Sequence, residues 1–427
     1  MKKFTLTIDY SYLCYKSLFV TADPKRINES KFLDSEEDKC ILTRKILKDI
    51  YTIIDKAIEL ISKENLESIV LACDSVTNFR KKILPESYKK DRKKHREENN
   101  TINFDEYFKI VNDISEVLRE SSSIISVLKH YNFEADDLIY GMSSNENFNN
   151  LIYASDSDLE QTLSENVYMF KTYKDTKTLF VNENYAKIDD NKENKKDIIK
   201  EFDSFIEKDD NFFDSFFNNN EIKVFDENKT LNILEKSKLL NYKIEKVDVL
   251  ELVLSKIISG DVSDNIQSIF YNLDESDIKK KCRKPFIKKI FKKYLEINEN
   301  QKYFDIKLKP EVNLFFNFFV DHLFSEKYLE SDINKIDAIR EKLNNNFNIN
   351  YDLIVFNNET YEKYCNEIPT KFIEDSNIKK FDNKLYVNEF ENNDILKIIL
   401  KVLEINEELI EKYCKKENII NIDFKIF

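Results

Sequence analysis

Three short apolar segments of this sequence are each followed at once by aspartate. They are residues 4–8 before Asp9, 68–73 before Asp74, and 151–155 before Asp156 and Asp158. Residues 38–62 and 105–120, which lie between these segments, carry apolar side chains at the spacing of an amphipathic helix. Short strands that alternate with helices predict an α/β fold with a central, mainly parallel sheet flanked by helices. Ligands of such sheets bind at the carboxyl ends of the strands, where these aspartates fall.

The composition is typical of a soluble globular protein. Of 427 residues, 41% are hydrophobic and 34% are charged, which supplies a large core and excludes collagen and wholesale disorder. The sequence has no apolar run of roughly 18 to 20 residues, as a membrane helix needs, and residues 1–13 resemble a strand more than a signal peptide. The six cysteines lack CxxC spacing, so reduced thiols in the cytoplasm fit better than disulfides or a zinc site.

The periodicity divides the chain into four parts. We expect an N-terminal α/β domain at 1–180, an insertion of unknown role at 181–245, a helical module at 246–350 and a small C-terminal α/β extension at 351–427. The strands of the extension are predicted from two apolar segments, 351–356 and 384–390. Ligand-binding residues are therefore expected in the first and third parts, which contain the acidic strand and helix ends.

Charge is unevenly distributed along the chain. The formal net charge of -13 argues against a general polyanion binder, because an acidic surface repels phosphate. Two basic blocks depart from that average, one at 80–96 and one at 279–293, and the second holds no acidic residue. A run of like charge is often only a solvated helix face. Two dense basic blocks in an acidic chain nevertheless favour contact with phosphate groups.

Two further acidic groups bring the set of carboxylates at segment ends to nine. Asp261 and Asp264 follow an apolar helix, and Glu134, Asp136 and Asp137 begin another one. Each acid alone is explained as a helix cap or a turn residue. Together at one edge of a sheet, they would raise one another's pKa and destabilise the fold unless cations neutralise them. Oxygen ligands without His or Cys favour Mg²⁺ or Mn²⁺, and two such ions about 4 Å apart suit phosphodiester hydrolysis.

Five motifs resemble, in order and spacing, those of the flap-endonuclease and 5′ nuclease superfamily. They are IDYSYL at 8–13, LACDSVTNFRKKILPESYKKDR at 71–92, FEADD at 133–137, ASDSDLEQ at 154–161 and SGDVSDNI at 259–266. Within the superfamily, the segment from VLACDS to FDEYF is most similar to the T-even-phage ribonuclease H branch. The resemblance covers about residues 3–175 and 246–350. It implies a metal-dependent 5′ to 3′ exonuclease and flap endonuclease with ribonuclease H activity, acting in primer removal during phage DNA replication.

The resemblance also assigns the carboxylates to two metal ions, Mg²⁺ or Mn²⁺. One ion would be held by Asp9, Asp74, Glu134 and Asp136, and the other by Asp156, Asp158, Asp261 and Asp264, with Asp137 nearby. Together these residues would form the metal centre at which the phosphodiester is hydrolysed.

Residues 80–104 would form a basic arch above that centre. In the arch, Lys89 would contact the scissile phosphate, Arg92 would assist it, and Tyr88 would stack on an unpaired base. Compact cations beside an aromatic ring suit these roles on physical grounds. Other cations of the arch would bind nucleic acid: Arg80, Lys81, Lys82, Lys90, Lys93, Lys94 and Arg96.

The sequence departs from the family pattern after Gly260. The family has a GxGxxTA turn there, whose backbone amides grip the unbroken strand, but this chain has no glycine beyond that position. In its place are lysines that we expect to hold duplex DNA: Lys284, Lys288, Lys289, Lys292 and Lys293. Side-chain charges would make this grip more sensitive to salt than backbone amides do.

The expected substrates are DNA and RNA:DNA hybrids with branched or flapped 5′ ends, recognised by structure because no base edge need be read. We expect a monomer in the cytoplasm of a bacterial host, without membrane association, and the family implies a phage single-stranded-DNA-binding protein or sliding clamp as partner. Three alternatives stay open. The first is a catalytically silent DNA-binding protein of this fold, which would be expected to lack some of the carboxylates. The second is a PIN-type ribonuclease for single-stranded RNA, but such proteins are shorter and lack the arch. The third is a small-molecule phosphatase, which would have no need of the basic blocks.

Overall fold

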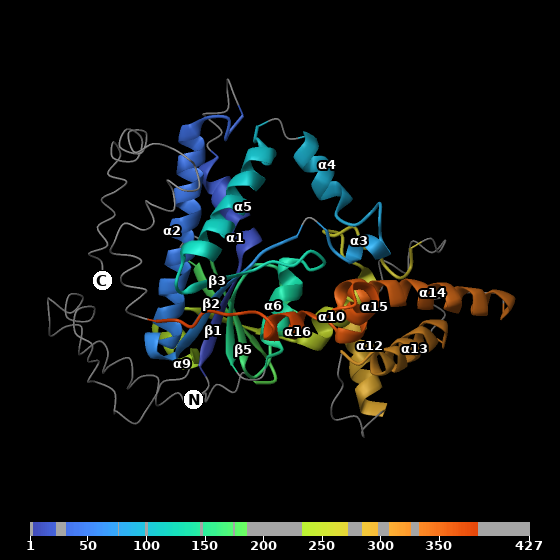
Figure 1. Ribbon diagram of the computed structural model, residues 1–427. Helices are drawn as coiled ribbons and strands as arrows, with labels where there is room; N and C mark the ends of the chain where they lie inside the picture. Colours follow the sequence, from blue (N-terminus) through green and yellow to red (C-terminus); the bar gives the residue numbers. More distant parts are fainter. Residues whose placement is uncertain are drawn as a thin grey trace.

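A computed structural model of the protein describes most of the chain (Figure 1). The described residues are 3–22, 31–75, 77–98, 101–145, 148–173, 176–185, 233–271, 284–297, 307–325 and 333–382. The predicted strand at 384–390 lies outside them. Within these ranges, no helix combines the length and the apolar character needed to cross a membrane.

A seven-stranded sheet forms the centre of the first part of the fold, with strands from residues 4 to 247. Its strands are β1 (Phe4–Asp9), β2 (Leu66–Ala72), β3 (Ile125–Leu128), β4 (Asn149–Tyr153), β5 (Val167–Tyr173), β6 (Thr176–Asn182) and β7 (Lys243–Val247). They lie in the order β3-β2-β1-β4-β5-β6-β7, and among the described strands only β5 and β6 pair in antiparallel fashion. The predicted fold class, a mainly parallel sheet flanked by helices, is confirmed.

The sheet has its topological switch point between β1 and β4, because the strand order runs outwards in opposite directions from this pair. Asp9 pairs with Ala72 of β2, and Ile8 pairs with Tyr153 of β4. The acids that end or follow these three strands therefore meet at one edge of the sheet. Strand β1 is buried along its whole length, as expected for a central strand covered on both faces.

Helices cover both faces of the sheet (Figure 1). On one face, α1 (Tyr10–Thr21), α2 (Glu36–Ile61) and α5 (Phe104–Ser121) share a core with the strands. On the other face, the covering helices are α6 (Ala135–Ser143), α15 (Asn358–Cys365) and α16 (Pro369–Glu374). Helix α2 illustrates why these segments are helical, since Ser35 caps it by accepting a bond from Asp38 N at 3.1 Å and three acids follow in the first turn.

A second group of helices has its own apolar core. It comprises α10 (Val249–Ser259), α12 (Lys284–Ile297), α13 (Lys309–Ser325) and α14 (Ile333–Ile354). Phenylalanines of the LFFNFFV segment fill this core, where Phe316 stacks on Phe347 with ring centroids 4.0 Å apart. The helical character of the C-terminal part, which the sequence predicted, is confirmed.

The predicted strand at 351–356 is wrong. Tyr351–Ile354 form the last turn of α14, and their apolar side chains are buried against the other helices. A short apolar run does not distinguish a strand from a buried helix end. The side-chain amide of Asn350, which donates to the carbonyl oxygens of Ile257 and Gln267 at 2.8 and 2.9 Å, fixes this turn on α10.

The chain then returns from α14 to the sheet. Helix α16 packs on α6 so closely that a Cβ atom at Gly141 would lie 2.9 Å from the backbone of Pro369. Beyond α16, Lys379 N donates to Ser126 Oγ of β3, and Phe381 N donates to the carbonyl of Glu67 in β2, each at 2.7 Å. The described part of the C-terminal segment therefore links the second group of helices to the β3 edge of the sheet.

Two remaining segments frame the site. The expected arch contains α3 (Arg80–Ile83) and α4 (Lys90–Glu98), which Figure 1 shows above the carboxyl ends of the strands. Of the segment 181–245, the structure describes the end of β6, α9 (Ile233–Leu239) and β7. Strand β7 pairs with β6, so this part of the segment belongs to the sheet.

Candidate functional site

Three aspartates lie at the switch point of the sheet. Asp9 ends β1 and caps α1, with its Oδ1 accepting from Tyr12 N at 2.9 Å. Asp74 follows β2 and accepts from Ala135 N, the first residue of α6, at 2.9 Å. Asp156 follows β4 and accepts from Asp158 N at 2.9 Å as the cap of a short 3₁₀ helix, η2 (Ser157–Thr162). The predicted convergence of these strand ends is thus present in the structure.

The acids nearest the switch point carry strongly perturbed pKa values. Burial, followed by the charge on Asp74, raises the pKa of Asp9 to about 7. The pKa of Asp136 is raised well above its usual range by burial and then by Asp156 and Asp9. Crowding by the surrounding protein, followed by the charge on Glu134, raises the pKa of Asp74 as well, although its side chain keeps contact with solvent. This group is therefore short of positive charge, which a divalent cation would supply.

The other five predicted ligands are engaged in ion pairs, while the four acids Asp9, Asp74, Asp136 and Asp156 make none among the described residues. The five engaged acids are Glu134, Asp137, Asp158, Asp261 and Asp264. In the part of the chain that the structure describes, no three His, Cys, Asp or Glu side chains form a ready-made metal cage. The donor chemistry, carboxylate oxygen throughout, nevertheless fits Mg²⁺ or Mn²⁺.

Glu134 is the most heavily bonded of these acids. Its Oε1 accepts from Lys89 Nζ at 2.7 Å and from Asn78 Nδ2 at 3.1 Å, and its Oε2 accepts from Tyr88 OH at 2.7 Å. Arg80 Nη1 also donates to Glu134 Oε2, at 3.3 Å. Burial alone would raise the pKa of Glu134, but the charges of Lys89 and Arg80 lower it to about 2. Glu134 is therefore ionised, and four donors surround its two oxygens.

Arg80 and Asp137 form a buried ion pair beneath the site. The guanidinium donates to both oxygens of Asp137, at 2.7 and 2.9 Å, and its Nε donates to the carbonyl of Leu353 at 3.1 Å. Asp137 is wholly buried and also accepts from Tyr361 OH at 2.8 Å and from Glu134 N at 2.8 Å. The structure thus separates both residues from their predicted roles, because Arg80 faces no solvent in which to meet nucleic acid and Asp137 has no oxygen left for a metal ion.

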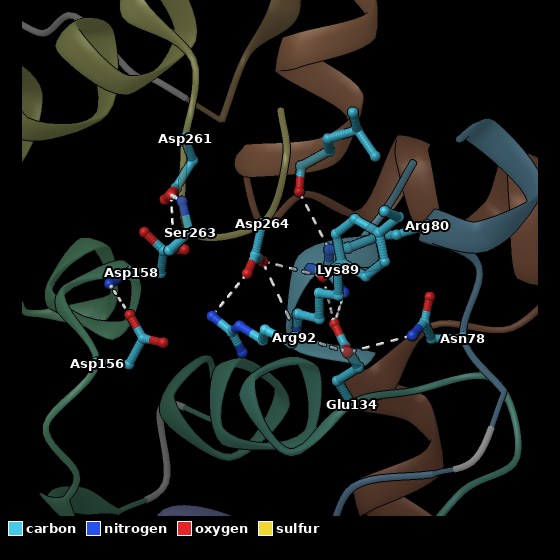
Figure 2. A network of polar contacts seen from close by, with 12 residues as sticks. Asn78, Arg80, Lys89, Arg92, Glu134, Asp156, Asp158, Asp261, Ser263 and Asp264 are labelled. Carbon is cyan, nitrogen blue, oxygen red and sulfur yellow. Dashed lines mark hydrogen bonds and ion pairs between the residues drawn. The ribbon is translucent and has the colours of Figure 1, made fainter. Parts of the chain in front are cut away.

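The loop that carries the GDVSDN motif fastens the base of the arch. Lys89 N donates to the carbonyl of Asp264 at 3.2 Å, and Arg92 lies 2.8 Å from Asp264 Oδ1. Asp91 and Asn265 bond reciprocally, at 2.7 and 3.3 Å. Figure 2 shows Arg92 and Asp264 between Asp156 and Asp158 on one side and the cluster around Glu134 on the other. The base of the arch and the acidic loop are therefore joined by several bonds in this structure.

Tyr88 is buried, so it cannot stack on an unpaired base as the sequence predicted. The residue is 6% exposed, and its hydroxyl contacts both Glu134 at 2.7 Å and Asp264 at 3.2 Å. A base cannot reach the ring in this arrangement. Tyr88 instead positions two carboxylates, a role that the sequence did not indicate.

Lys256 is a residue of the candidate site that the sequence reasoning missed. Its Nζ donates to Asp158, lies 3.2 Å from Asp261 Oδ2 and reaches Ser157 Oγ at 3.1 Å. Burial opposes ionisation of Asp261, but bonds from Ser263 and the charge of Lys256 lower the pKa of Asp261. One signal was available in the sequence, since Lys256 is the sole cation within the apolar helix 249–259.

The remaining predicted nucleic-acid contacts divide by exposure. The exposed ones are Lys81, Lys82, Lys90, Lys93, Lys94, Lys289, Lys292 and Lys293. Lys288 pairs with Glu251, and Arg96 donates to Tyr15 OH at 3.0 Å and lies over the ring of Phe108. The side chain of Lys284 lies outside the described part of the structure.

Solved structures of bacteriophage T5 proteins are similar to this chain at low identity. A T5 protein co-crystallised with metal ions is 13% identical over 95% of this chain and 100% of its own, with a TM-score of 0.40. The T5 5′-exonuclease with bound zinc is 12% identical over 94% and 99% of the two chains, with a TM-score of 0.41. A variant T5 flap endonuclease with DNA and metal ions is 12% identical over 94% and 100%, with a TM-score of 0.42.

Sequence comparisons give two results. No curated protein matches the chain. The family model of the 5′-3′ exonuclease, N-terminal resolvase-like domain, matches residues 5–193, which contain β1 to β6, the arch and seven of the nine carboxylates. The N-terminal part of this chain is therefore similar to the N-terminal domain of 5′-3′ exonucleases, over somewhat less than half of its length.

Proposed function

We propose that the protein is a metal-dependent 5′ nuclease, a 5′ to 3′ exonuclease and flap endonuclease that hydrolyses phosphodiesters near the 5′ ends of RNA-primed or branched DNA. The observation that carries the proposal is the group of Asp9, Asp74 and Asp136, whose pKa values are raised by burial and then by neighbouring acids, beside the cations Lys89 and Arg92. A site short of positive charge, with two cations at its edge, suits a phosphate and its metal ions.

The proposed metal ligands follow the two groups that the resemblance to the family implies. Asp9, Asp74 and Asp136, with Glu134 beside them, would hold one Mg²⁺ or Mn²⁺ ion. Four acids would hold the other: Asp156, Asp158, Asp261 and Asp264. Bound there, the metal ions supply an activated water molecule and stabilise charge on the phosphate.

The chain's own cations have separate roles in the proposal. Lys89 and Arg92 are held at the edge of the site by Glu134 and Asp264, and would turn from these acids to the scissile phosphate when substrate binds. There they stabilise the negative charge that develops on the phosphoryl oxygens. The exposed lysines of α4 and α12 hold the nucleic-acid backbone, so specificity is for the structure of the substrate.

Finer parts of the proposal are supported by the motifs alone. These parts are ribonuclease H activity, removal of RNA primers in phage replication, action as a monomer in the bacterial cytoplasm, and partnership with a single-stranded-DNA-binding protein or sliding clamp. The segment SYKKDRKKHREE with FDEYF, which resembles the T-even-phage ribonuclease H branch, supports the first two.

The test is cleavage of a 5′-labelled flap and an RNA-primed duplex in Mg²⁺ and in EDTA. We expect short 5′ products in Mg²⁺ only, and none from an Asp156→Asn, Asp158→Asn double variant. Asp321→Asn is the control, because Asp321 is an exposed acid paired with Arg340 far from the site in sequence and fold. A wild-type protein that binds the branched DNA but cuts neither substrate in Mg²⁺ or Mn²⁺ would instead be a silent DNA-binding protein.

A further inference from the structure

Lys256 places a positive charge between two acids that the proposed function assigns to one metal ion. Its ammonium group donates to Asp158 and lies 3.2 Å from Asp261 Oδ2. The lysine comes from α10, whereas Asp158 belongs to η2 at the sheet edge, so the contact joins two separate parts of the fold. The contact between Lys256 and Asp261 is also largely buried, since their side chains are 17% and 11% exposed.

The two proposed groups of ligands differ in this respect. In the first group, Asp9, Asp74 and Asp136 make no ion pair within the described ranges, and Glu134 is paired with Lys89 and Arg80 at the edge of the site. Asp158 and Asp261 already share a cation at the place where a bridging ion would lie. A divalent ion and an ammonium group cannot both occupy the space between the same two carboxylates.

We propose that Lys256 is an internal cation that takes the place of the second divalent ion in the metal-free protein and has to withdraw before that ion binds. The inference rests on the proposed function, because it concerns the ions of the same centre. Lys256 keeps Asp158 and Asp261 from repelling each other when metal is absent, and competes with metal when it is present. Lys256 is thus a positioning residue, which sets how tightly one ion is held.

The experiment measures metal binding without nucleic acid. Mn²⁺ is titrated into the full chain and free Mn²⁺ is counted by electron paramagnetic resonance, with Mg²⁺ calorimetry as the second measurement. The variants are Lys256→Met, which removes the charge at similar length, and Lys256→Arg, which keeps it. Lys39→Met is the matched control, because Lys39 also bridges two acids, Glu36 and Glu106, each at 3.0 Å, and is 18% exposed.

We expect Lys256→Met to bind one of its ions about tenfold or more tightly than wild type, since two facing carboxylates lose their internal cation. Lys256→Arg and Lys39→Met should bind as wild type does. Adding Asp261→Asn to Lys256→Met should abolish the gain, which places the affected ion between Asp158 and Asp261. Circular dichroism melts verify that each variant is folded.

Two results would overturn the inference. Unchanged or weaker binding by Lys256→Met, in a chain whose wild type binds the ions, would show that Lys256 does not compete with metal, and the proposed function would stand. A gain that persists with Asp261→Asn would show that the ion binds elsewhere. If neither wild type nor Lys256→Met binds any ion, the metal centre of the proposed function fails as well, so the two failures are distinguishable.

Discussion

Lys89 Nζ lies 2.7 Å from Glu134 Oε1, so a cation of the arch is paired directly with an acid of the sheet edge. Burial would lower the pKa of Lys89, but Glu134 and Asp264 raise it, and the ammonium group stays charged. Lys89 also has a left-handed backbone conformation, with φ of 54°, which only a few non-glycine residues adopt. The surroundings thus hold this lysine in place at some cost in strain.

Replacing Lys89 by methionine should lower nuclease activity on a flap substrate by about 10² to 10³-fold, because one preorganised charge at the phosphate is lost. Single-turnover rates at saturating substrate measure the effect on the chemical step. Lys39→Met serves as the control and should retain wild-type rates, since Lys39 pairs with Glu36 and Glu106 outside the site. Full activity of the Lys89 variant would contradict the assigned role.

Replacing Arg80 by methionine should destabilise the protein by about 3 to 5 kcal/mol, because it leaves the fully buried Asp137 without its cation. Urea denaturation followed by circular dichroism measures the change in the free energy of unfolding. Lys93→Met is the comparison and should change stability by less than about 0.5 kcal/mol, since its pair with Glu97 is exposed. A small effect of Arg80→Met would show that Arg80 is not the anchor of this region.

The sequence predicted that the acids meet at one edge of the sheet, because this prediction needed only the local pattern of short apolar strands that each end in an acid. Parallel strands that each end in an acid bring those acids together whatever the rest of the fold does, and Asp9, Asp74 and Asp156 lie accordingly. The same reasoning could not determine the partner of each acid. Arg80 was assigned to nucleic acid because it begins a basic block, yet its partners include the carbonyl of Leu353, which is 273 residues away in sequence.

Long-range contacts also account for the other differences. Asp137 was counted as a metal ligand, but Tyr361, 224 residues away, occupies one of its oxygens. Tyr88 is buried where its hydroxyl meets Asp264 of the GDVSDN loop, which is 176 residues away in sequence. Lys256 has Asp261 five residues away in the sequence, but its other partner, Asp158, is 98 residues away, so the sequence did not reveal that Lys256 bridges the two acids. Such pairings follow from the tertiary fold, which periodicity and motif spacing do not specify.

Asp352 should make the stability of the protein depend on acid pH. Burial opposes its ionisation, but bonds from Lys309 and Lys363, at 2.7 and 2.9 Å, lower the pKa of Asp352 below its ordinary value of 3.8. A lowered folded-state pKa contributes stability above the unfolded pKa, and this stability is lost as pH falls through the folded-state value. We therefore expect Asp352→Asn to cost about 1 to 3 kcal/mol at pH 7 and progressively less below about pH 4.

Denaturant titrations of both proteins between pH 7 and pH 2 measure this dependence. Asp321→Asn is the control, because its pair with Arg340 is exposed and should contribute little at any pH. A constant difference between wild type and Asp352→Asn over the whole range would contradict the ionic origin of the stabilisation.

The reciprocal bonds between Asp91 and Asn265 should slow the opening of the arch helix. Asn265 has φ of 60°, a conformation that asparagine tolerates, so the change is better made at Asp91. Asp91→Ala loses the bond from Asn265 Nδ2, at 2.7 Å, and should speed amide hydrogen exchange in residues 90–98 roughly fivefold, for a bond of about 1 kcal/mol. Glu97→Ala, which removes an exposed pair on the same helix, should change the exchange rates less.

The exposed lysines of α12 should determine the salt dependence of DNA binding. Lys289, Lys292 and Lys293 are exposed on one basic helix, and each phosphate contact that is lost lowers the slope of log affinity against log salt by about one. The triple variant with methionine at these positions should therefore bind a flap substrate, in EDTA to prevent cleavage, with a slope smaller by about three. Lys309→Met, which removes a lysine paired with Asp352, should leave the slope as it is. An unchanged slope in the triple variant would mean that the duplex lies elsewhere, and that the lysines after Gly260 do not replace the glycine-rich turn of the family.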